Sequence, residues 1–230
     1  MTAFLDRRAF LVSASAVPLL ALPSCNTLGD LGGGFGLADA IRRLLTLSSQ
    51  RAFARLLAPD GFFQDELARI SLPQQLGGSG ATSILSALLR TGPVRDRLLR
   101  QVNRAAEDAA DAAAPVVYDS IRSLSLADAV SIVRGGPRAA TSILRDAVGG
   151  AVVSRLLPDV GSALRLFDSA IVNEALRAAT GINFAGLADD VSRKTGDAIF
   201  RAIGREEAAI RANPRETGDP LLIGVFGVLG

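Results

Sequence analysis

Residues 93–114 read PVRDRLLRQVNRAAEDAADAAA, and their spacing is the clearest structural signal in the chain. Apolar side chains recur every three or four residues, and charged side chains occupy the opposite face. This periodicity predicts an amphipathic helix that begins near Gly92, with Pro93 in its first turn, where proline is favoured. The alanines after Ala105 leave room for a neighbouring helix to approach closely. The apolar stripe consists of Val94, Leu98, Val102, Ala105 and Ala109.

The same helical spacing appears elsewhere in the chain, and no segment shows the alternation that is typical of a strand. We therefore predict an all-α protein, in which residues 37–230 form a compact bundle of about six to eight helices. The apolar tail, residues 221–230, is too short to span a membrane and is expected to dock on the core. The predicted helices begin near Leu37, Ile84, Gly92, Ser125, Ala140, Leu164 and Leu187.

Prolines and capping residues predict where these helices end. The sequence Pro59-Asp60-Gly61 stops the first helix, and an irregular or extended segment follows as far as Pro73. Pro115 either kinks its helix or opens the next one, and Pro158 marks a break. Ser125 and Asp128 have capping-box spacing, with Asp in place of Glu, and predict the start of a helix.

The composition excludes several classes of protein. The chain has 230 residues, of which 49% are hydrophobic and 21% charged, so it can form a packed core. It contains no His, the usual general base and the commonest metal ligand. Its single Cys excludes an intrachain disulfide and a cysteine-rich zinc site. These absences exclude most familiar hydrolases, and a net charge of +2 does not indicate a nucleic-acid partner.

Residues 1–24 are typical of a cleaved signal peptide. A twin arginine is followed, one residue on, by Phe-Leu, and a short apolar stretch then continues to Leu22. A positive region, an apolar region and a small-residue cleavage site mark a secretory signal, and the twin arginine indicates export through the Tat system. The predicted export motif consists of Arg7, Arg8, Phe10 and Leu11.

The leader ends at Leu22-Pro23-Ser24-Cys25, which resembles a bacterial lipobox. In lipoproteins with this pattern the cysteine is acylated and the leader is cut before it. Two or three acyl chains on Cys25 would hold the protein on a membrane, whereas one chain would not. Residues 25–36 are then the lipidated N-terminus and a flexible Gly-rich tether. The alternative is a soluble export signal that contains a cysteine by chance.

These features predict a periplasmic protein that is anchored to a membrane through acyl chains on Cys25. The next residue is Asn26 rather than Asp, which by resemblance to sorted lipoproteins favours the outer membrane. The membrane is therefore the first expected partner, and no nucleic acid is expected.

Three separated motifs follow one another along the chain. They are PDGFF at 59–63 with ISLP at 70–73, NRAAE at 103–107 with Ala114-Pro115, and EEAAIRANP at 206–214 before a C-terminal Leu-Leu-x-x-Val-Phe-Gly. In order and spacing they resemble the bacterial domain of unknown function (DUF) 4197 family, from about Leu37 to Gly230. The resemblance implies an exported, mostly helical protein, and several members look like lipoproteins. It implies no activity.

The best polar candidates are Asn103, Arg104 and Glu107, which lie within one turn of each other on a predicted helix. Arg104 has the geometry to recognise a carboxylate or phosphate with two hydrogen bonds, so the three residues are a candidate binding cluster. The alternative is a polar clamp between helices, because buried polar groups usually satisfy one another.

Other acidic residues are candidates for acid–base chemistry or Ca²⁺ binding, but no EF-hand loop is present. Most of them have an opposite charge four residues away, so we predict salt bridges on solvated helix faces instead. No metal and no cofactor are expected. The predicted pairs are Arg104 with Asp108, Asp189 with Arg193, Asp190 with Lys194, and Glu207 with Arg211.

From the sequence we expect a non-enzymatic lipoprotein of the cell envelope that acts as an interaction or scaffold module. Its partner would be another envelope protein. The alternative is a carrier that shelters an apolar or lipid-like ligand between its helices. A third hypothesis is an enzyme with an unfamiliar site of Asp, Glu and Arg.

Overall fold

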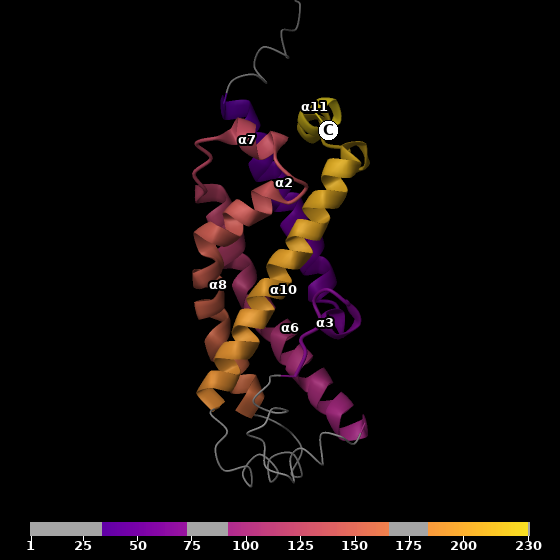
Figure 1. Ribbon diagram of the computed structural model, residues 1–230, viewed down its shortest axis with the longest axis vertical. Helices are drawn as coiled ribbons and strands as arrows, with labels where there is room; N and C mark the ends of the chain where they lie inside the picture. Colours follow the sequence, from indigo (N-terminus) through magenta and orange to yellow (C-terminus); the bar gives the residue numbers. More distant parts are fainter. Residues whose placement is uncertain (1–33, 73–91, 166–183, 230) are drawn as a thin grey trace, which may run out of the picture.

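The chain folds as an all-α bundle built on four long helices that run along its length (Figure 1). These are α2 (Gly34–Leu56), α6 (Gly92–Ser123), α8 (Ala139–Arg165) and α10 (Phe184–Ala212). Seven α-helices, one 3-10 helix and no strand occur in the parts of the chain that are described. The computed structural model describes residues 34–72, 92–165 and 184–229.

The shorter elements connect or cover the long helices. The single turn α3 (Gly61–Gln64) follows α2, and α7 (Ala129–Arg134) lies between α6 and α8. The chain ends with the 3-10 helix η1 (Pro214–Thr217) and with α11 (Pro220–Leu229). Figure 1 shows α7 and α11 at the end of the bundle where α2 begins, and both helices pack against α2.

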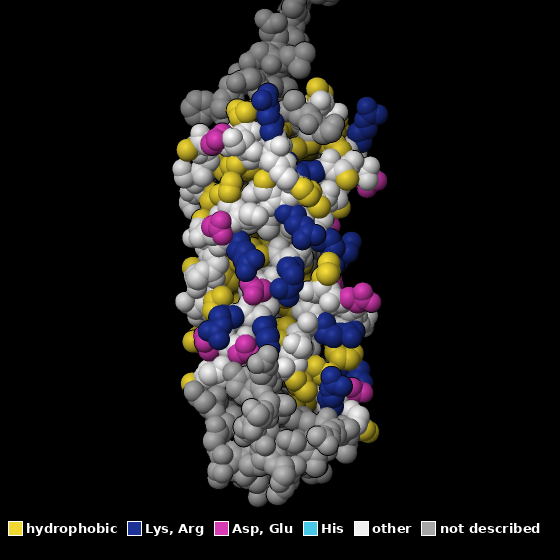
Figure 2. Space-filling model, in the orientation of Figure 1, with side chains coloured by type: hydrophobic (Ala, Val, Ile, Leu, Met, Phe, Trp, Pro, Cys, Tyr) yellow, Lys and Arg dark blue, Asp and Glu magenta, His cyan; other side chains and the backbone are white. Residues whose placement is uncertain are grey.

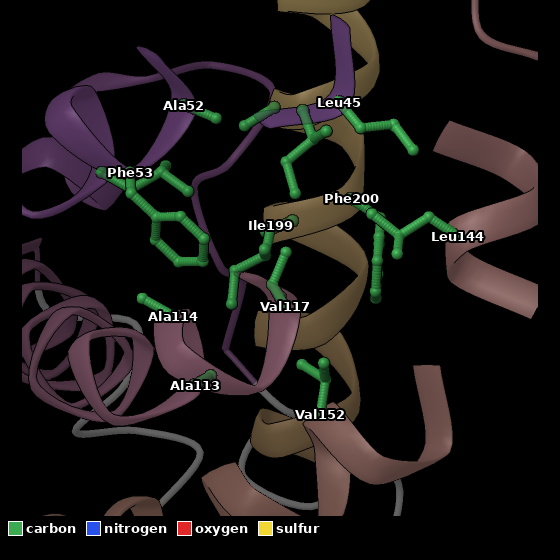
Figure 3. Close-up of a cluster of buried hydrophobic side chains, with 14 of the residues drawn as sticks. Leu45, Ala52, Phe53, Ala113, Ala114, Val117, Leu144, Val152, Ile199 and Phe200 are labelled. Atoms are coloured by element: carbon green, nitrogen blue, oxygen red, sulfur yellow. The ribbon is translucent and has the colours of Figure 1, made fainter. Parts of the chain in front are cut away.

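The core lies where the apolar faces of the four long helices meet. Figure 3 shows Phe53 of α2, Val117 of α6, Leu144 of α8 and Ile199 of α10 pointing toward one another. Each of these side chains is at most 3% exposed. Burying a side chain of this size contributes about 1.5–3 kcal/mol. The predicted alanine-rich stretch of α6 is also buried, so the neighbouring helices approach it closely.

Several predicted elements are confirmed. A helix begins at Gly92 with Pro93 in its first turn, and α10 covers the predicted stretch up to Asn213. The apolar tail forms α11, which docks on the core through Leu222, Val225 and Phe226.

The predicted break at Pro158 is wrong, because α8 continues through it, and α6 likewise continues through Pro115. Both prolines are exposed, so the missing N–H and the bulky ring lie on the solvent side of the helix. Leu156 and Val160, which flank Pro158, are fully buried. Their burial outweighs the local cost of the proline, which is about 3 kcal/mol in a helix interior.

Two helices begin at residues other than the predicted ones. The N-cap of α7 is Asp128, not Ser125, because the Asp128 carboxylate itself accepts the hydrogen bond from the Ser131 N–H at 3.0 Å. At the other end of the domain, α2 begins at Gly34, so the last three residues of the predicted tether belong to the helix.

Some predictions fall on parts of the chain that the structure does not describe. The predicted helix near Ile84 and most of the one that ends at Gly181 lie outside the described residues, whereas Leu164 belongs to α8. The predicted signal peptide and tether up to residue 33 lie outside them as well. These include Arg7, Arg8, Phe10, Leu11 and Cys25.

Candidate functional site

Asn103 lies on α6 and is fully buried. Its side-chain oxygen accepts a hydrogen bond from the Ile70 N–H at 2.8 Å, and its side-chain nitrogen donates to the Ile70 carbonyl at 3.1 Å. The same nitrogen donates to the Leu99 carbonyl one turn earlier, at 2.8 Å. Asn103 thus satisfies both backbone groups of a residue that has no neighbouring strand or helix to pair with.

Glu107 lies one turn after Asn103 and binds the start of the same segment. Its Oε1 accepts a hydrogen bond from the Phe62 N–H at 3.2 Å. Burial raises the pKa of this carboxyl above its usual range, although the hydrogen bond from Phe62 opposes the shift. Asn103 and Glu107 together hold the segment 60–70 against α6.

The turn that starts this segment is closely fitted. Asp60 adopts a left-handed conformation with φ 58°, and Gly61 follows it. A Cβ atom on Gly61 would lie 2.3 Å from the Arg55 carbonyl oxygen and 2.6 Å from that of Leu56. Only glycine fits there, which explains the Asp-Gly pair where α2 ends.

Helix α10 binds the other side of the segment. The Arg205 guanidinium contacts the Asp65 carboxylate through NH1 at 3.0 Å and NH2 at 2.7 Å. The hydrogen bond from Arg205, more than any other factor, holds the pKa of Asp65 below its usual value. Arg201 adds a hydrogen bond from its Nε to the Leu67 carbonyl at 3.0 Å. The segment 60–70 is therefore clamped between α6 and α10.

Arg104 does not join the other two residues of the predicted cluster. Its side chain is exposed, and it forms no hydrogen bond or ion pair with any residue that the structure describes. The predicted pair with Asp108 is therefore not formed. Arg104 affects Glu107 only through a long-range attraction, which slightly lowers the pKa of that carboxyl.

Glu207 on α10 is fully buried and binds the start of α8. Its Oε1 accepts from the Ala140 N–H at 3.1 Å, and its Oε2 accepts from the Thr141 N–H at 2.7 Å and from the Thr141 hydroxyl at 2.6 Å. The first amides of a helix have no partner within the helix, and a negative charge there is favourable. Glu207 therefore caps α8 from a neighbouring helix.

Arg211 completes the arrangement around Glu207. Its Nε donates to Glu207 Oε1 at 2.8 Å, and its two terminal nitrogens donate to the carbonyls of Val133 at 2.9 Å and Ile132 at 3.1 Å. Those carbonyls belong to the last turn of α7, which a positive charge stabilises. The guanidinium also lies 4.7 Å from the centre of the Phe226 ring in α11.

The prediction that Glu207 and Arg211 pair on a solvated face is half wrong. The pair forms, but the Glu207 side chain is 0% exposed and that of Arg211 is 10% exposed. The neighbouring Glu206 is also buried, with Arg55 NH2 at 3.5 Å. The sequence contained a signal for this burial, because Glu207 lies on the apolar stripe between Ile203 and Ile210.

Two of the other predicted pairs form at the surface. Lys194 Nζ lies 2.9 Å from Asp190, and Arg193 contacts Asp189. Basic and acidic side chains are interspersed along the face drawn in Figure 2. No group of three or more Asp, Glu or Cys side chains in the described ranges is arranged to hold a metal ion. None of the described helices is long and apolar enough to cross a membrane.

The family comparison covers almost all of this structure. A family described as a protein of unknown function, DUF4197, matches residues 35–227. The chain belongs to the DUF4197 family. No curated protein and no solved structure matched it. The match in this DUF4197 protein extends from the first turn of α2 into α11, and it contains both the clamp on residues 60–70 and the Glu207–Arg211 pair.

Replacing Asn103 tests the clamp. In Asn103→Ala the buried N–H and C=O of Ile70 lose their partners, and we expect the free energy of unfolding to fall by about 2–4 kcal/mol. The control, Arg104→Ala, removes an exposed side chain next to it and should change stability by about 0.5 kcal/mol or less. Urea unfolding followed by circular dichroism measures both. Equal stabilities of the two variants would contradict the clamp.

Replacing Glu207 tests the buried pair. In Glu207→Gln the charge of Arg211 stays buried without its counter-ion, and one side-chain acceptor becomes a donor that faces other donors. We expect a loss of about 3–5 kcal/mol in unfolding free energy. The exposed Glu66→Gln serves as the control and should remain within about 0.5 kcal/mol of the unmodified DUF4197 protein. A loss of that small size in Glu207→Gln would show that the pair does not support the fold.

Glu107 and Asp65 should affect the pH dependence of stability with opposite signs. The raised pKa of Glu107 contributes stability that is present below 4.5 and is lost as pH rises through the folded-state pKa. Glu107→Gln should therefore become more stable relative to the unmodified protein as the pH is raised to neutral.

Asp65, whose pKa is lowered, contributes stability that is present above 3.8 and is lost on acidification. Asp65→Asn should therefore be destabilised at neutral pH, and its deficit should shrink in acid. Urea unfolding of both variants across this range checks the two signs. Parallel pH profiles for the two variants would refute the assignment.

Proposed function

We propose that this DUF4197 protein is a non-enzymatic, lipid-anchored protein of the cell envelope, whose helical bundle acts as an interaction or scaffold module. The leader with its twin arginine and the lipobox-like sequence at Cys25 support export and anchoring. The absence of His from the chain supports a role without acid–base chemistry.

The main structural support is where the buried polar side chains direct their hydrogen bonds. Asn103 and Glu107 bind the backbone of residues 60–70, and Glu207 binds the backbone at the start of α8. A general acid or base must instead reach a proton on a substrate. These side chains stabilise the fold. A protein that binds partners through its surface needs such a rigid fold.

The hollows on the described surface lend no support to a catalytic site. One of them has a volume of about 450 Å³ and lies between α2 and the start of α11. Its one ion pair joins Arg43 Nε to Asp219 at 2.6 Å, and the same carboxylate also accepts hydrogen bonds from the Leu221 and Leu222 amides of α11. Asp219 is therefore engaged in capping a helix.

A carrier of lipid-like molecules is the second candidate. The observation in its favour is a hollow of about 440 Å³, which is lined mainly by Leu157, Pro158, Ala185 and Ala188. Pockets that hold apolar ligands are usually concave and lined by such side chains.

Membrane fractionation and native mass spectrometry of Cys25→Ser test the proposal, with Ser24→Ala as a matched control that keeps the cysteine. We expect the unmodified chain and the control to carry acyl chains and to stay with the membrane, because two or three chains anchor stably. Cys25→Ser should leave the membrane fraction. Retention of Cys25→Ser in the membrane would contradict anchoring, and a further stoichiometric lipid on the unmodified chain would favour the carrier.

A further inference from the structure

Helix α11 is apolar on every side. Its sequence, PLLIGVFGVL, contains no polar residue. Leu222, Val225 and Phe226 are buried against the bundle. The remaining face includes Ile223 and Val228, and Val228 is 75% exposed. A surface helix normally turns polar residues outward, and a helix that is apolar all round is normally covered on all sides.

The neighbouring helix α7 extends this apolar surface. It packs against α11 at the same end of the bundle (Figure 1). Val130 of α7 is 46% exposed. Beside it lies a hollow of about 360 Å³ that is lined mostly by the apolar residues Leu126, Ala127, Ala129 and Val130, together with Ala38 of α2. Two adjacent elements therefore expose large apolar side chains at one end of the molecule.

This end also receives the chain that comes from Cys25. Ala38 and Arg42, in the first turns of α2, line the same hollow, and Arg42 donates a hydrogen bond to the Leu124 carbonyl at 3.4 Å. Gly34 lies nine residues after Cys25, so the connecting chain reaches at most about 30 Å. Helix α6 alone, with 32 residues, is about 48 Å long. An anchor on Cys25 therefore keeps this end near the bilayer.

We propose that this end of the bundle, with the outer face of α11 and Val130, rests on the phospholipid bilayer in which Cys25 is anchored. The inference depends on the proposed function, since it needs the acyl anchor. With ten residues α11 is about 15 Å long, too short to cross the bilayer. It lies along the boundary between head groups and acyl chains, where apolar helix faces are typically buried by about 5–10 Å.

The absence of Trp from the chain allows a direct test with single introduced indoles. Val228→Trp places the indole on the outer face of α11. Leu57→Trp, just after the far end of α2 at a side chain that is 37% exposed, is the matched control. Both positions are exposed enough to accept the larger ring. The full chains, purified from membranes with their anchor, are reconstituted into phosphatidylethanolamine–phosphatidylglycerol vesicles whose acyl chains carry bromine, which quenches indole fluorescence.

We expect both variants to float with the vesicles and bromine to quench the indole strongly at position 228 and not at position 57. Flotation with equal or no quenching at the two positions would overturn this inference and leave the anchor intact. A shielded, unquenched indole at 228 in a chain that sediments as a dimer would overturn it too, because a second copy then covers α11. Failure to float would refute the anchor itself, and the inference with it.

Discussion

The buried ion pair of Glu207 and Arg211 is the interaction on which the arrangement of the bundle depends. The turn between α7 and α8 leaves unpaired carbonyls at the end of one helix and unpaired amides at the start of the next. Arg211 binds the carbonyls and Glu207 binds the amides, both from α10. Each charge lies at the helix terminus that favours it, and each neutralises the other in the interior. One turn of α10 thus sets where two other helices meet.

The helices could be predicted from their apolar stripes, but not where they end. Proline at position 158 has a large local cost in a helix, and sequence reasoning counts only that cost. In the folded chain the burial of Leu156 and Val160 on either side exceeds it, so α8 continues. The capping box failed for a similar reason: Asp128 caps the backbone directly and leaves Ser125 no role. Boundaries depend on tertiary packing, which a local pattern does not contain.

The polar contacts were predictable only in part. The spacing of Asn103 and Glu107 placed them on one face, but their partners are backbone groups more than thirty residues earlier in the chain. No local rule pairs a side chain with a distant irregular segment. Glu207 was wrongly predicted to lie on a solvated face, because the rule for opposite charges four residues apart describes exposed helices. Its position on the apolar stripe with Ile203 and Ile210 was the better guide, since a carboxylate there must be buried and paired.

The same buried pair also determines which face α11 presents outward. Arg211 stacks on Phe226, so the charge that closes the turn between α7 and α8 also fixes the rotation of the last helix. At the start of α11, Asp219 caps its first amides and binds Arg43 of α2. These two contacts fix the rotation of α11 as far as Phe226, and Val228 follows on the side that faces away from the bundle. The exposure of the apolar outer face of α11 therefore follows from the interactions that hold the bundle together.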